Sequence, residues 1–319
     1  MRIGIDARKI SDYGIGTYIR GLLGALAATG EDEIVAFAPT GTALPGGVAH
    51  VAVDAPHYSL RELVAVGRAA NQAHIDLFHA PHYVVPFTRV PVVVTIHDLI
   101  HLTQPPRNPL APFYARAMLG RAVRKARRVL TVSEASKRAI VETLLVAPDD
   151  VVVTPNGVDE RFFGAVRNEG DYFLFVGNDK PHKNLGVLRE AAARVPGARL
   201  VVAGASNFVS DDELLALYRG AIALVMPSAE EGFGLPAAEA MACGTPVITS
   251  RAAALVEITG DPALHVDAEP GALARAMQRL LDDEALRRAM SVRGRERARA
   301  FTWTRCAELT RAAYRAAVA

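Results

Sequence analysis

Short apolar runs with helical stretches between them recur along the whole chain, and this alternation constrains the fold more than any other feature. It is typical of βαβ units and a parallel sheet. The pattern breaks near residue 165 and then starts again, so two successive parallel sheets are predicted. The expected strands are residues 2–6, 34–38, 77–79, 90–96, 129–132 and 151–154, and then 172–176, 200–203, 222–226, 246–249 and 263–266.

The break between the two patterns predicts a domain boundary. Residues 155–170 have turn chemistry and no apolar period, and they contain several glycines. We therefore expect an N-terminal domain of residues 1–165 and a second domain of residues 166–300. Residues 301–319 read as a final helix with Trp303, Leu309 and Tyr314 as apolar anchors.

Composition excludes several classes of protein. A chain of 319 residues, half of them hydrophobic, is long enough for two cores. The formal charge of +2 is too small for a dedicated nucleic-acid binder. Cys243 and Cys306 have no metal-ligand spacing and predict neither a zinc site nor a disulfide framework. This cysteine usage fits a reducing cytoplasm. No apolar run approaches the ~18 residues of a membrane span, so a soluble or peripherally attached protein is expected.

The segment of residues 231–239 places two carboxylates around a glycine-rich turn that begins a helix. Gly232 and Gly234 leave the backbone bare, so its amides can approach a ligand. Glu231 in the loop and Glu239, expected in the first helical turn, can each accept two hydrogen bonds from a vicinal diol. This arrangement suits a sugar nucleotide. The alternative is a helix start with acidic residues near its positive end.

A second loop in the same half carries cations. Lys180 and Lys183 follow the strand of residues 172–176 at the expected start of a helix. Cations oppose the helix dipole there, so an anion between them, such as a diphosphate, is the simplest account. The alternative is a solvated loop with incidental lysines.

The first half contains a shorter glycine motif. Gly14 and Gly16 predict a tight loop before a helix that begins near Thr17, and such a loop can hold phosphate with its amides. A third glycine would fall at Ile19, so the dinucleotide fingerprint is incomplete and a nicotinamide dehydrogenase is disfavoured. An ordinary strand-to-helix turn is an equal alternative.

Histidines follow two strands of the first sheet. His97 and Asp98 end one strand at the edge where open α/β folds bind ligands, and His97 could bond a sugar hydroxyl. His79 and His82 follow another strand and are candidates for the acceptor side; their spacing makes no metal site. The alternative for a lone histidine is a structural role.

A basic segment, residues 116–128, mixes arginines with apolar residues. It predicts either a helix that touches anionic lipid or a solvated helix face.

Taken in order, these motifs resemble the retaining glycosyltransferases of the GT-B fold usually called family 4. Residues 131–133, 155–159 and 243–248 and the closing 301–303 also match, so the resemblance runs nearly end to end. It implies an α/β chain of two Rossmann-like domains that face a cleft, with the last helix crossing back to the first domain. It also implies a co-substrate nucleotide-diphosphate sugar, no cofactor and no required metal.

The resemblance carries roles onto individual positions. Glu231 would contact the donor sugar, Glu239 the ribose and Lys183 the diphosphate, with His97 near the reaction centre. The implied catalytic residues are therefore His97, Lys183 and Glu231. The implied donor-binding residues are Gly14, Gly16, Asn178, Lys180, Lys183, Glu231, Gly232, Phe233, Gly234, Leu235 and Glu239, and the acceptor-side candidates are His79, His82 and Asp98.

The chain departs from the family pattern in two places. Asn178 and His182 stand where an arginine often lies in the phosphate loop. The segment of residues 205–210 is short where family members insert a helix and a strand, which puts base recognition in doubt. We expect a retaining hexosyltransferase, with mannose as the leading sugar and a glycan or lipid-linked saccharide as acceptor. Alternatives are a sugar-nucleotide epimerase, a phosphorylase or a catalytically silent nucleotide-sugar binder. Oligomeric state does not follow from the sequence.

Overall fold

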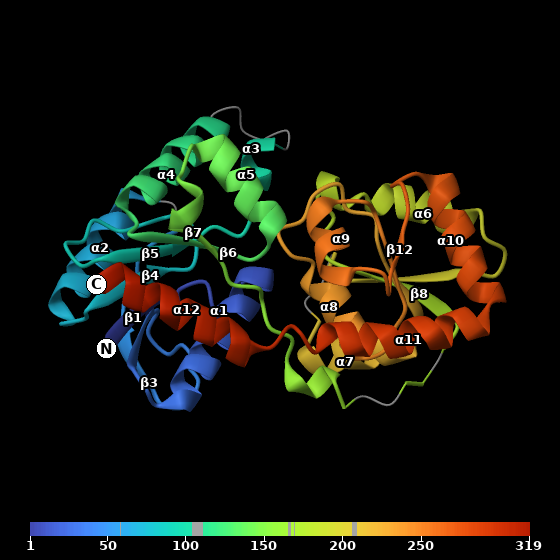
Figure 1. Cartoon of the computed structure of the whole chain (residues 1–319), viewed down its shortest axis with the longest axis horizontal. Helices are drawn as coiled ribbons and strands as arrows, with labels where there is room; N and C mark the ends of the chain where they lie inside the picture. Colours follow the sequence, from blue (N-terminus) through green and yellow to red (C-terminus); the bar gives the residue numbers. More distant parts are fainter. Residues whose placement is uncertain (58, 104–110, 165–166, 169, 206–208) are drawn as a thin grey trace. The chain divides into compact units, whose positions relative to one another are not determined.

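The chain forms two compact units in the computed structural model, which describes residues 1–57, 59–103, 111–164, 167–168, 170–205 and 209–319. Unit 1 combines Met1–Gly157 with Trp303–Ala319, and unit 2 is Val158–Thr302 (Figure 1). The predicted boundary at residues 165 and 166 lies outside the described residues, and the division falls earlier. The division falls at Val158 because this residue already contacts the end of unit 2. Its backbone N–H donates to the carbonyl of Phe301 at 3.0 Å, and it forms a β-bridge with Thr302. The chain therefore enters and leaves unit 2 at adjacent points.

Unit 1 is built on a seven-stranded parallel sheet in the order β3-β2-β1-β4-β5-β6-β7. Its strands are β1 (Arg2–Asp6), β2 (Glu33–Ala38), β3 (Val48–Ala52), β4 (Leu77–Ala80), β5 (Val92–Thr95), β6 (Arg128–Thr131) and β7 (Val151–Val153). Six of them were predicted. The edge strand β3 was missed because it pairs only with β2 and its residues are largely exposed, so it lacks a continuous apolar run.

Helices cover both faces of this sheet. Its helices are α1 (Tyr13–Thr29), α2 (Leu60–Gln72), α3 (Ile100–Thr103), α4 (Ala111–Lys125), α5 (Glu134–Leu144) and α12 (Trp303–Val318). Leu22 of α1 and Tyr314 of α12 belong to one buried core, and Val66 of α2, Leu119 of α4 and Ile140 of α5 belong to the other. The last helix is thus part of unit 1, although in the sequence all of unit 2 separates it from the rest of that unit.

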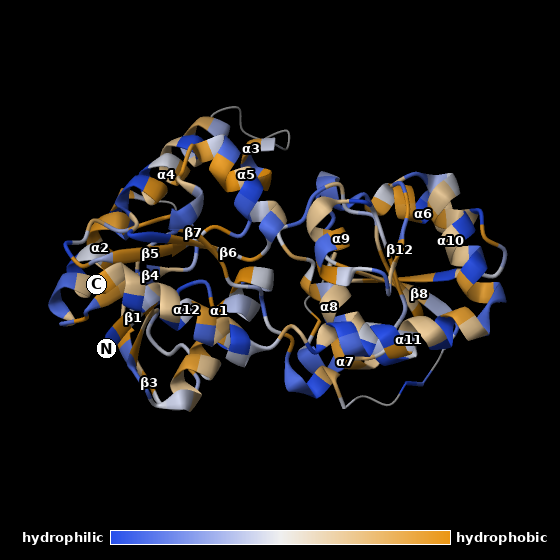
Figure 2. Cartoon of the chain, in the orientation of Figure 1, coloured by the Kyte–Doolittle hydropathy of each residue, from blue (hydrophilic) through white to orange (hydrophobic). Residues whose placement is uncertain are grey.

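Unit 2 has a five-stranded parallel sheet in the order β12-β11-β10-β8-β9. Its central strands β8, β10 and β11 are apolar and mostly buried, whereas the edge strands β9 and β12 are only partly buried. The apolar colour of β8 can be followed in Figure 2. Helices α6 and α10 share a buried core with β8, β10 and β11. The elements are β8 (Tyr172–Val176), β9 (Arg199–Ala203), β10 (Ala221–Met226), β11 (Val247–Thr249), β12 (Leu264–His265), α6 (Leu185–Ala193), α7 (Asp211–Gly220), α8 (Leu235–Ala242), α9 (Ala253–Thr259), α10 (Pro270–Asp282) and α11 (Glu284–Ala298).

Candidate functional site

Two loops of unit 2 meet at the carboxyl ends of β8 and β10, which are adjacent strands. The backbone N–H of Ala229 donates to the carbonyl of His182 at 2.7 Å. The side-chain amide of Asn184 donates to the carbonyl of Pro227 at 2.9 Å. Asn184 has a φ of 52° at the start of α6, a backbone conformation that asparagine tolerates. These bonds hold the lysine-bearing loop against the glutamate-bearing loop.

Lys183 and Glu231 form an ion pair across these loops. The Lys183 ammonium donates to Glu231 Oε1 at 2.6 Å, and the two side chains are 16% and 10% exposed. A lysine ammonium carries three donors and a carboxylate has two oxygens, so both groups keep capacity for a ligand. The structure therefore brings together the two candidates that the sequence placed 48 residues apart.

Helix α8 begins beside Glu231 with free backbone amides. Gly234 has a φ of 94°, and a Cβ there would lie 2.5 Å from Leu255 Cδ2, so only glycine fits. Phe233 is buried and packs edge-on against Phe301, with ring centroids 5.4 Å apart. Within the described part of the chain, the amides of Phe233, Gly234 and Leu235 have no hydrogen-bond acceptor. They form an anion-binding end of the helix.

Glu239 was predicted in the first turn of the helix. It lies in the second turn of α8, because the helix begins at Leu235. The side chain is buried, and its Oε2 accepts a hydrogen bond from the hydroxyl of Tyr218 at 2.8 Å. Burial raises the pKa of Glu239 to about 7, although the hydrogen bond from Tyr218 opposes that shift. A carboxyl that titrates near neutrality is a common property of ligand sites.

The remaining donor-side candidates flank the ion pair in sequence. Asn178 follows β8, and its Oδ1 is enclosed without a hydrogen-bond donor among the described residues. Lys180 is exposed and likewise has no carboxylate partner there. Both groups are available to a ligand, the first as an acceptor and the second as a cation. Gly232 is buried in the loop between Glu231 and Phe233.

In unit 1, Gly14 and Gly16 lie inside the first turn of α1, which begins at Tyr13 and not near Thr17 as predicted. A Cβ on Gly16 would lie 2.4 Å from the carbonyl oxygen of Ile10, whereas one on Gly14 would meet nothing within 4 Å. Gly16 therefore lets the helix pack against the preceding turn. This packing accounts for that glycine without a phosphate.

His97 is half-buried just beyond β5. Its Nε2 lies 3.0 Å from the carbonyl oxygen of Pro81, and burial lowers its pKa. Its own carbonyl accepts from the hydroxyl of Ser136 at 3.0 Å, near the start of α5. The carboxylate of the neighbouring Asp98 accepts from the backbone N–H of Ile100 at 3.0 Å and so begins α3.

His79 is fully enclosed, which corrects its assignment as an acceptor-side candidate. Its Nδ1 lies 2.7 Å from the hydroxyl of Tyr314 and its Nε2 lies 2.8 Å from Thr95 Oγ1. Both ring nitrogens are therefore occupied, and the side chain has no exposed surface. The structure assigns His79 a structural role.

His82 is also buried, with a backbone amide and a carboxylate around it. Its Nδ1 accepts from the N–H of Val84 at 3.1 Å, which leaves the proton on Nε2, 3.6 Å from Asp6 Oδ2. This tautomer orients the proton toward Asp6, so His82 contributes to the ion cluster around that residue. It too is poorly placed to meet an acceptor.

That ion cluster was missed by sequence reasoning. Arg8 contacts Asp6 through two nitrogens, at 2.9 and 2.7 Å, and Glu62 at 2.6 Å, and all three side chains are buried. Burial alone would raise the pKa of Asp6, but the Arg8 charge holds it below its usual range. The cluster ties the end of β1 to the first turn of α2. The Asp-Ala-Arg sequence gives no local sign of it, because Glu62 lies 54 residues from Arg8.

The basic segment is not one helix, because α4 ends at Lys125 and β6 begins at Arg128. Arg121 is held inside the unit, where it donates to the carbonyl of Val85 and lies over the Phe87 ring, 4.5 Å from its centroid. Arg116 and Arg124 are exposed. Only part of the predicted basic face is therefore available to a partner.

No group of three or more histidine, cysteine, aspartate or glutamate side chains is placed to hold a metal ion within the described residues. In the same residues, every helix is too short or too polar to cross a lipid bilayer.

Two solved structures superimpose on nearly the whole chain. The sucrose-phosphate synthase of Thermosynechococcus elongatus superimposes with a TM-score of 0.82 at 23% identity, over 99% of this chain and 98% of the other. HepE of Anabaena, solved with UDP and glucose, superimposes with a TM-score of 0.79 at 17% identity over 99% of each chain. The fold class is therefore GT-B, as predicted.

Sequence relatives narrow the class to a family. Family models for group 1 glycosyl transferases and for glycosyltransferase family 4 match residues 205–297 and 13–162. An uncharacterised glycosyltransferase of Methanocaldococcus jannaschii is 30% identical over 75% of each chain. The chain belongs to the GT-B glycosyltransferases of family 4, and it is an enzyme of that class.

Named relatives include mannosyltransferases. The O-antigen chain mannosyltransferase B of Escherichia coli is 28% identical, over 75% of this chain and 74% of its own. The MMP alpha-(1->4)-mannosyltransferase of Mycolicibacterium hassiacum is 34% identical over 63% of this chain, and the match spans only 57% of its length.

Proposed function

We propose that the chain transfers a hexose, with retention of configuration, from a nucleotide-diphosphate sugar to a saccharide acceptor. The Lys183–Glu231 ion pair carries this proposal. It places an ammonium cation 2.6 Å from a carboxylate that can accept hydrogen bonds from sugar hydroxyls, beside the free amides that begin α8. A nucleotide sugar needs both, since a phosphate oxygen suits the ammonium and a sugar hydroxyl suits the second carboxylate oxygen.

The chemistry follows from the charge that develops during transfer. The anomeric C–O bond breaks, the electron pair leaves with the nucleoside diphosphate, and the acceptor oxygen forms the new bond. Lys183, Lys180 and the α8 amides stabilise the growing charge on the diphosphate electrostatically. In the front-face route, a donor phosphate oxygen takes the acceptor proton. With positive groups in place beforehand, this route requires no metal.

Three further candidates take a part in this scheme. Glu239 binds the ribose hydroxyls, and Asn178 Oδ1 accepts from the donor. His97 acts on the acceptor from unit 1. The sugar we propose is mannose, supplied as GDP-mannose, because several related chains are named as mannosyltransferases. The acceptor is a growing glycan or a lipid-linked saccharide.

A thermal-shift panel of UDP-, GDP-, ADP- and dTDP-sugars tests the donor class. We expect GDP-mannose to raise the melting temperature most, since a ligand that binds only the folded state stabilises it by mass action. Incubation with the preferred donor and a glycan acceptor should then give an axial or equatorial linkage that matches the donor anomer. An epimerised donor would instead indicate a sugar-nucleotide epimerase, and a phosphate-dependent product would indicate a phosphorylase. Donor binding without any transfer would indicate a catalytically silent binder.

We also propose peripheral contact with an anionic membrane through unit 1. On the sheet face that carries α2 and α4, which share one core, exposed hydrophobic side chains occur on both helices and at Phe87, which contacts Leu63 of α2 and Arg121 of α4. They are Leu60, Val64, Phe87, Phe113 and Tyr114, exposed by 39% to 77%. In Figure 2 the outer side of α4 carries both hydrophilic and hydrophobic residues.

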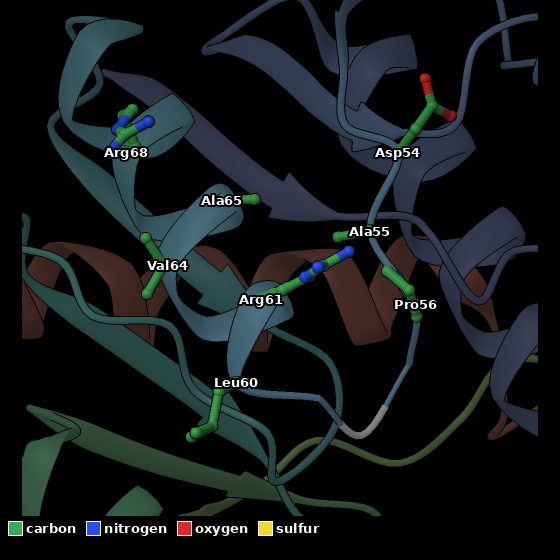
Figure 3. Close-up of a pocket in the computed structure, with 8 residues that line it drawn as sticks. All are labelled: Asp54, Ala55, Pro56, Leu60, Arg61, Val64, Ala65 and Arg68. Atoms are coloured by element: carbon green, nitrogen blue, oxygen red, sulfur yellow. The ribbon is translucent and has the colours of Figure 1, made fainter.

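A pocket of about 510 Å³ lies on this face beside α2. Figure 3 shows Arg61 extending toward Ala55 and Pro56 in it, with Arg68 two turns further along the helix. Neither arginine has a carboxylate partner in the described chain. The carboxylate of Asp54, which lines the same pocket, accepts from Thr40 instead. Cations without counter-ions beside exposed apolar groups suit an anionic lipid surface.

Sedimentation with vesicles tests this contact. We expect binding to vesicles that contain anionic lipid, reduced by salt, because screening weakens arginine–phosphate attraction. The double substitution Arg61→Ala with Arg68→Ala should weaken it about 30-fold, at about 1 kcal/mol per basic residue. The matched control, Arg275→Ala with Arg279→Ala on α10, should bind as the unaltered chain does. Equal binding to neutral vesicles would contradict the proposal.

A further inference from the structure

Helix α12 is fixed to unit 1 by contacts that leave it little freedom. Trp303 lies against Gly21 of α1, where a Cβ would come within 2.1 Å of the indole. Arg311 donates to Asp32 Oδ2 at 2.9 Å and to Glu31 Oε1 at 3.0 Å. An interior arginine with two carboxylate partners sets the position of the helix along its axis.

From this helix a chain of hydrogen bonds crosses the interior of unit 1. The Tyr314 hydroxyl lies 2.7 Å from His79 Nδ1, and His79 Nε2 lies 2.8 Å from Thr95 Oγ1. Thr95 Oγ1 in turn lies 2.9 Å from the hydroxyl of Tyr18. All four side chains have no exposed surface. These hydrogen bonds therefore join α12, β4, β5 and α1 through polar atoms inside an apolar core.

His79 can link these hydroxyls because it is neutral. Burial lowers the pKa of His79 to about 3, so near neutral pH its ring has one N–H donor and one bare nitrogen acceptor. It can accept from one hydroxyl while it donates to the other. Buried networks of this kind rigidify the groups they connect when each member is satisfied.

At its other end, the series of hydrogen bonds reaches Tyr18, which contacts His97. The Tyr18 ring packs edge-on against the His97 imidazole, with centroids 4.8 Å apart and planes at 85°. The imidazole is held from another side by the carbonyl of Pro81, which lies two residues after His79. Thr95 precedes His97 by two residues on the same strand end. Both supports of the imidazole are thus tied to the hydrogen-bonded chain.

We infer that Tyr18, His79, Thr95 and Tyr314 are positioning residues that make the orientation of His97 depend on helix α12. The inference rests on the role of His97 in the proposed function, but the coupling itself is a property of unit 1. It explains why a histidine at a ligand-binding edge is backed by four fully enclosed polar side chains that contact no ligand.

Histidine-labelled NMR on the full chain tests the coupling without any substrate. Tyr314→Phe removes one hydroxyl and keeps the ring, and we expect the His97 ring signals and their titration midpoint to move. Tyr18→Phe should move them as well. Tyr172→Phe is the matched control, because it removes a hydroxyl that donates to the Leu217 carbonyl at 2.8 Å in unit 2. It should leave His97 unchanged.

Transfer kinetics give the second readout. In Tyr314→Phe we expect kcat to fall about fivefold, the scale of one hydrogen bond, with an unchanged KM for the donor. A lowered melting temperature with unmoved His97 signals in both tyrosine variants would overturn the inference. If the unaltered chain transfers no sugar, the proposed function fails, but the NMR result still decides whether α12 and His97 are coupled. Failure of the function and failure of the coupling can therefore be distinguished.

Discussion

Replacing Lys183 or Glu231 with alanine should lower the turnover of sugar transfer at least ~100-fold, because each change removes stabilisation that is concentrated at the transition state. The two side chains touch at 2.6 Å, so their effects are not independent. The double variant should therefore lose much less than the product of the two single losses. Steady-state kinetics of both single variants and the double variant measure this coupling.

An exposed ion pair in the same unit supplies the control. Arg199 and Asp171 lie 3.0 Å apart with more than half of each side chain exposed. Alanine at either position should leave turnover near normal, since exposed pairs contribute little. Melting temperatures of all variants separate loss of chemistry from loss of fold. Near-normal rates in both Lys183→Ala and Glu231→Ala would defeat the site assignment.

We expect Glu239→Gln to make the folded chain more stable above pH 7 and to weaken its binding of the donor. The pKa of Glu239 is raised from 4.5 to about 7 by burial, so the folded state favours the protonated form. The native chain therefore loses stability as the pH rises from about 4.5 to about 7, and the loss persists above that range. Glutamine is neutral throughout and avoids that loss, which is at most about 3 kcal/mol for such a shift.

Melting curves from pH 4 to pH 9 measure the first effect. The variant and the unaltered chain should coincide at pH 4 and diverge progressively until about pH 7.5. Donor titration at pH 8 measures the second effect, for which we expect a loss of about 10- to 100-fold, the scale of hydrogen bonds to a charged group. Glu190→Gln, an exposed carboxyl on α6, should change neither. A variant that binds donor normally at pH 8 would remove Glu239 from the ribose site.

The fold could be predicted from the sequence because buried parallel strands leave a strong local signal. Every predicted strand exists, with ends that differ by two residues at most. The exposed edge strand β3 has no such signal, since His50 interrupts its apolar residues and no residue of the strand is fully buried. The start of α1 was placed too late because Gly14 and Gly16 favour a loop on propensity alone, whereas packing against Ile10 selects the helix.

The candidate site could be predicted only in its local parts. The glycine turn and acidic residues of 231–239 are adjacent in sequence, and a helix start confers their geometry. The pairing of Lys183 with Glu231 depends on the order of β8 and β10 in the sheet, and before the structure only the family resemblance placed the two residues at one donor site. His79 was an acceptor-side candidate because it ends a predicted strand. Its burial comes from Tyr314, 235 residues away, and no local pattern carries that information.

Unit 1 is discontinuous, and this has a consequence for synthesis on the ribosome. Residues 303–319 complete one of its two cores, but they emerge after all of unit 2. The nascent chain therefore exposes the part of α1 around Gly21 that Trp303 will cover, while unit 2, which is continuous, can already fold. Domains usually fold in the order in which they emerge. Here that order is reversed, so the first segment translated is the last to become fully native.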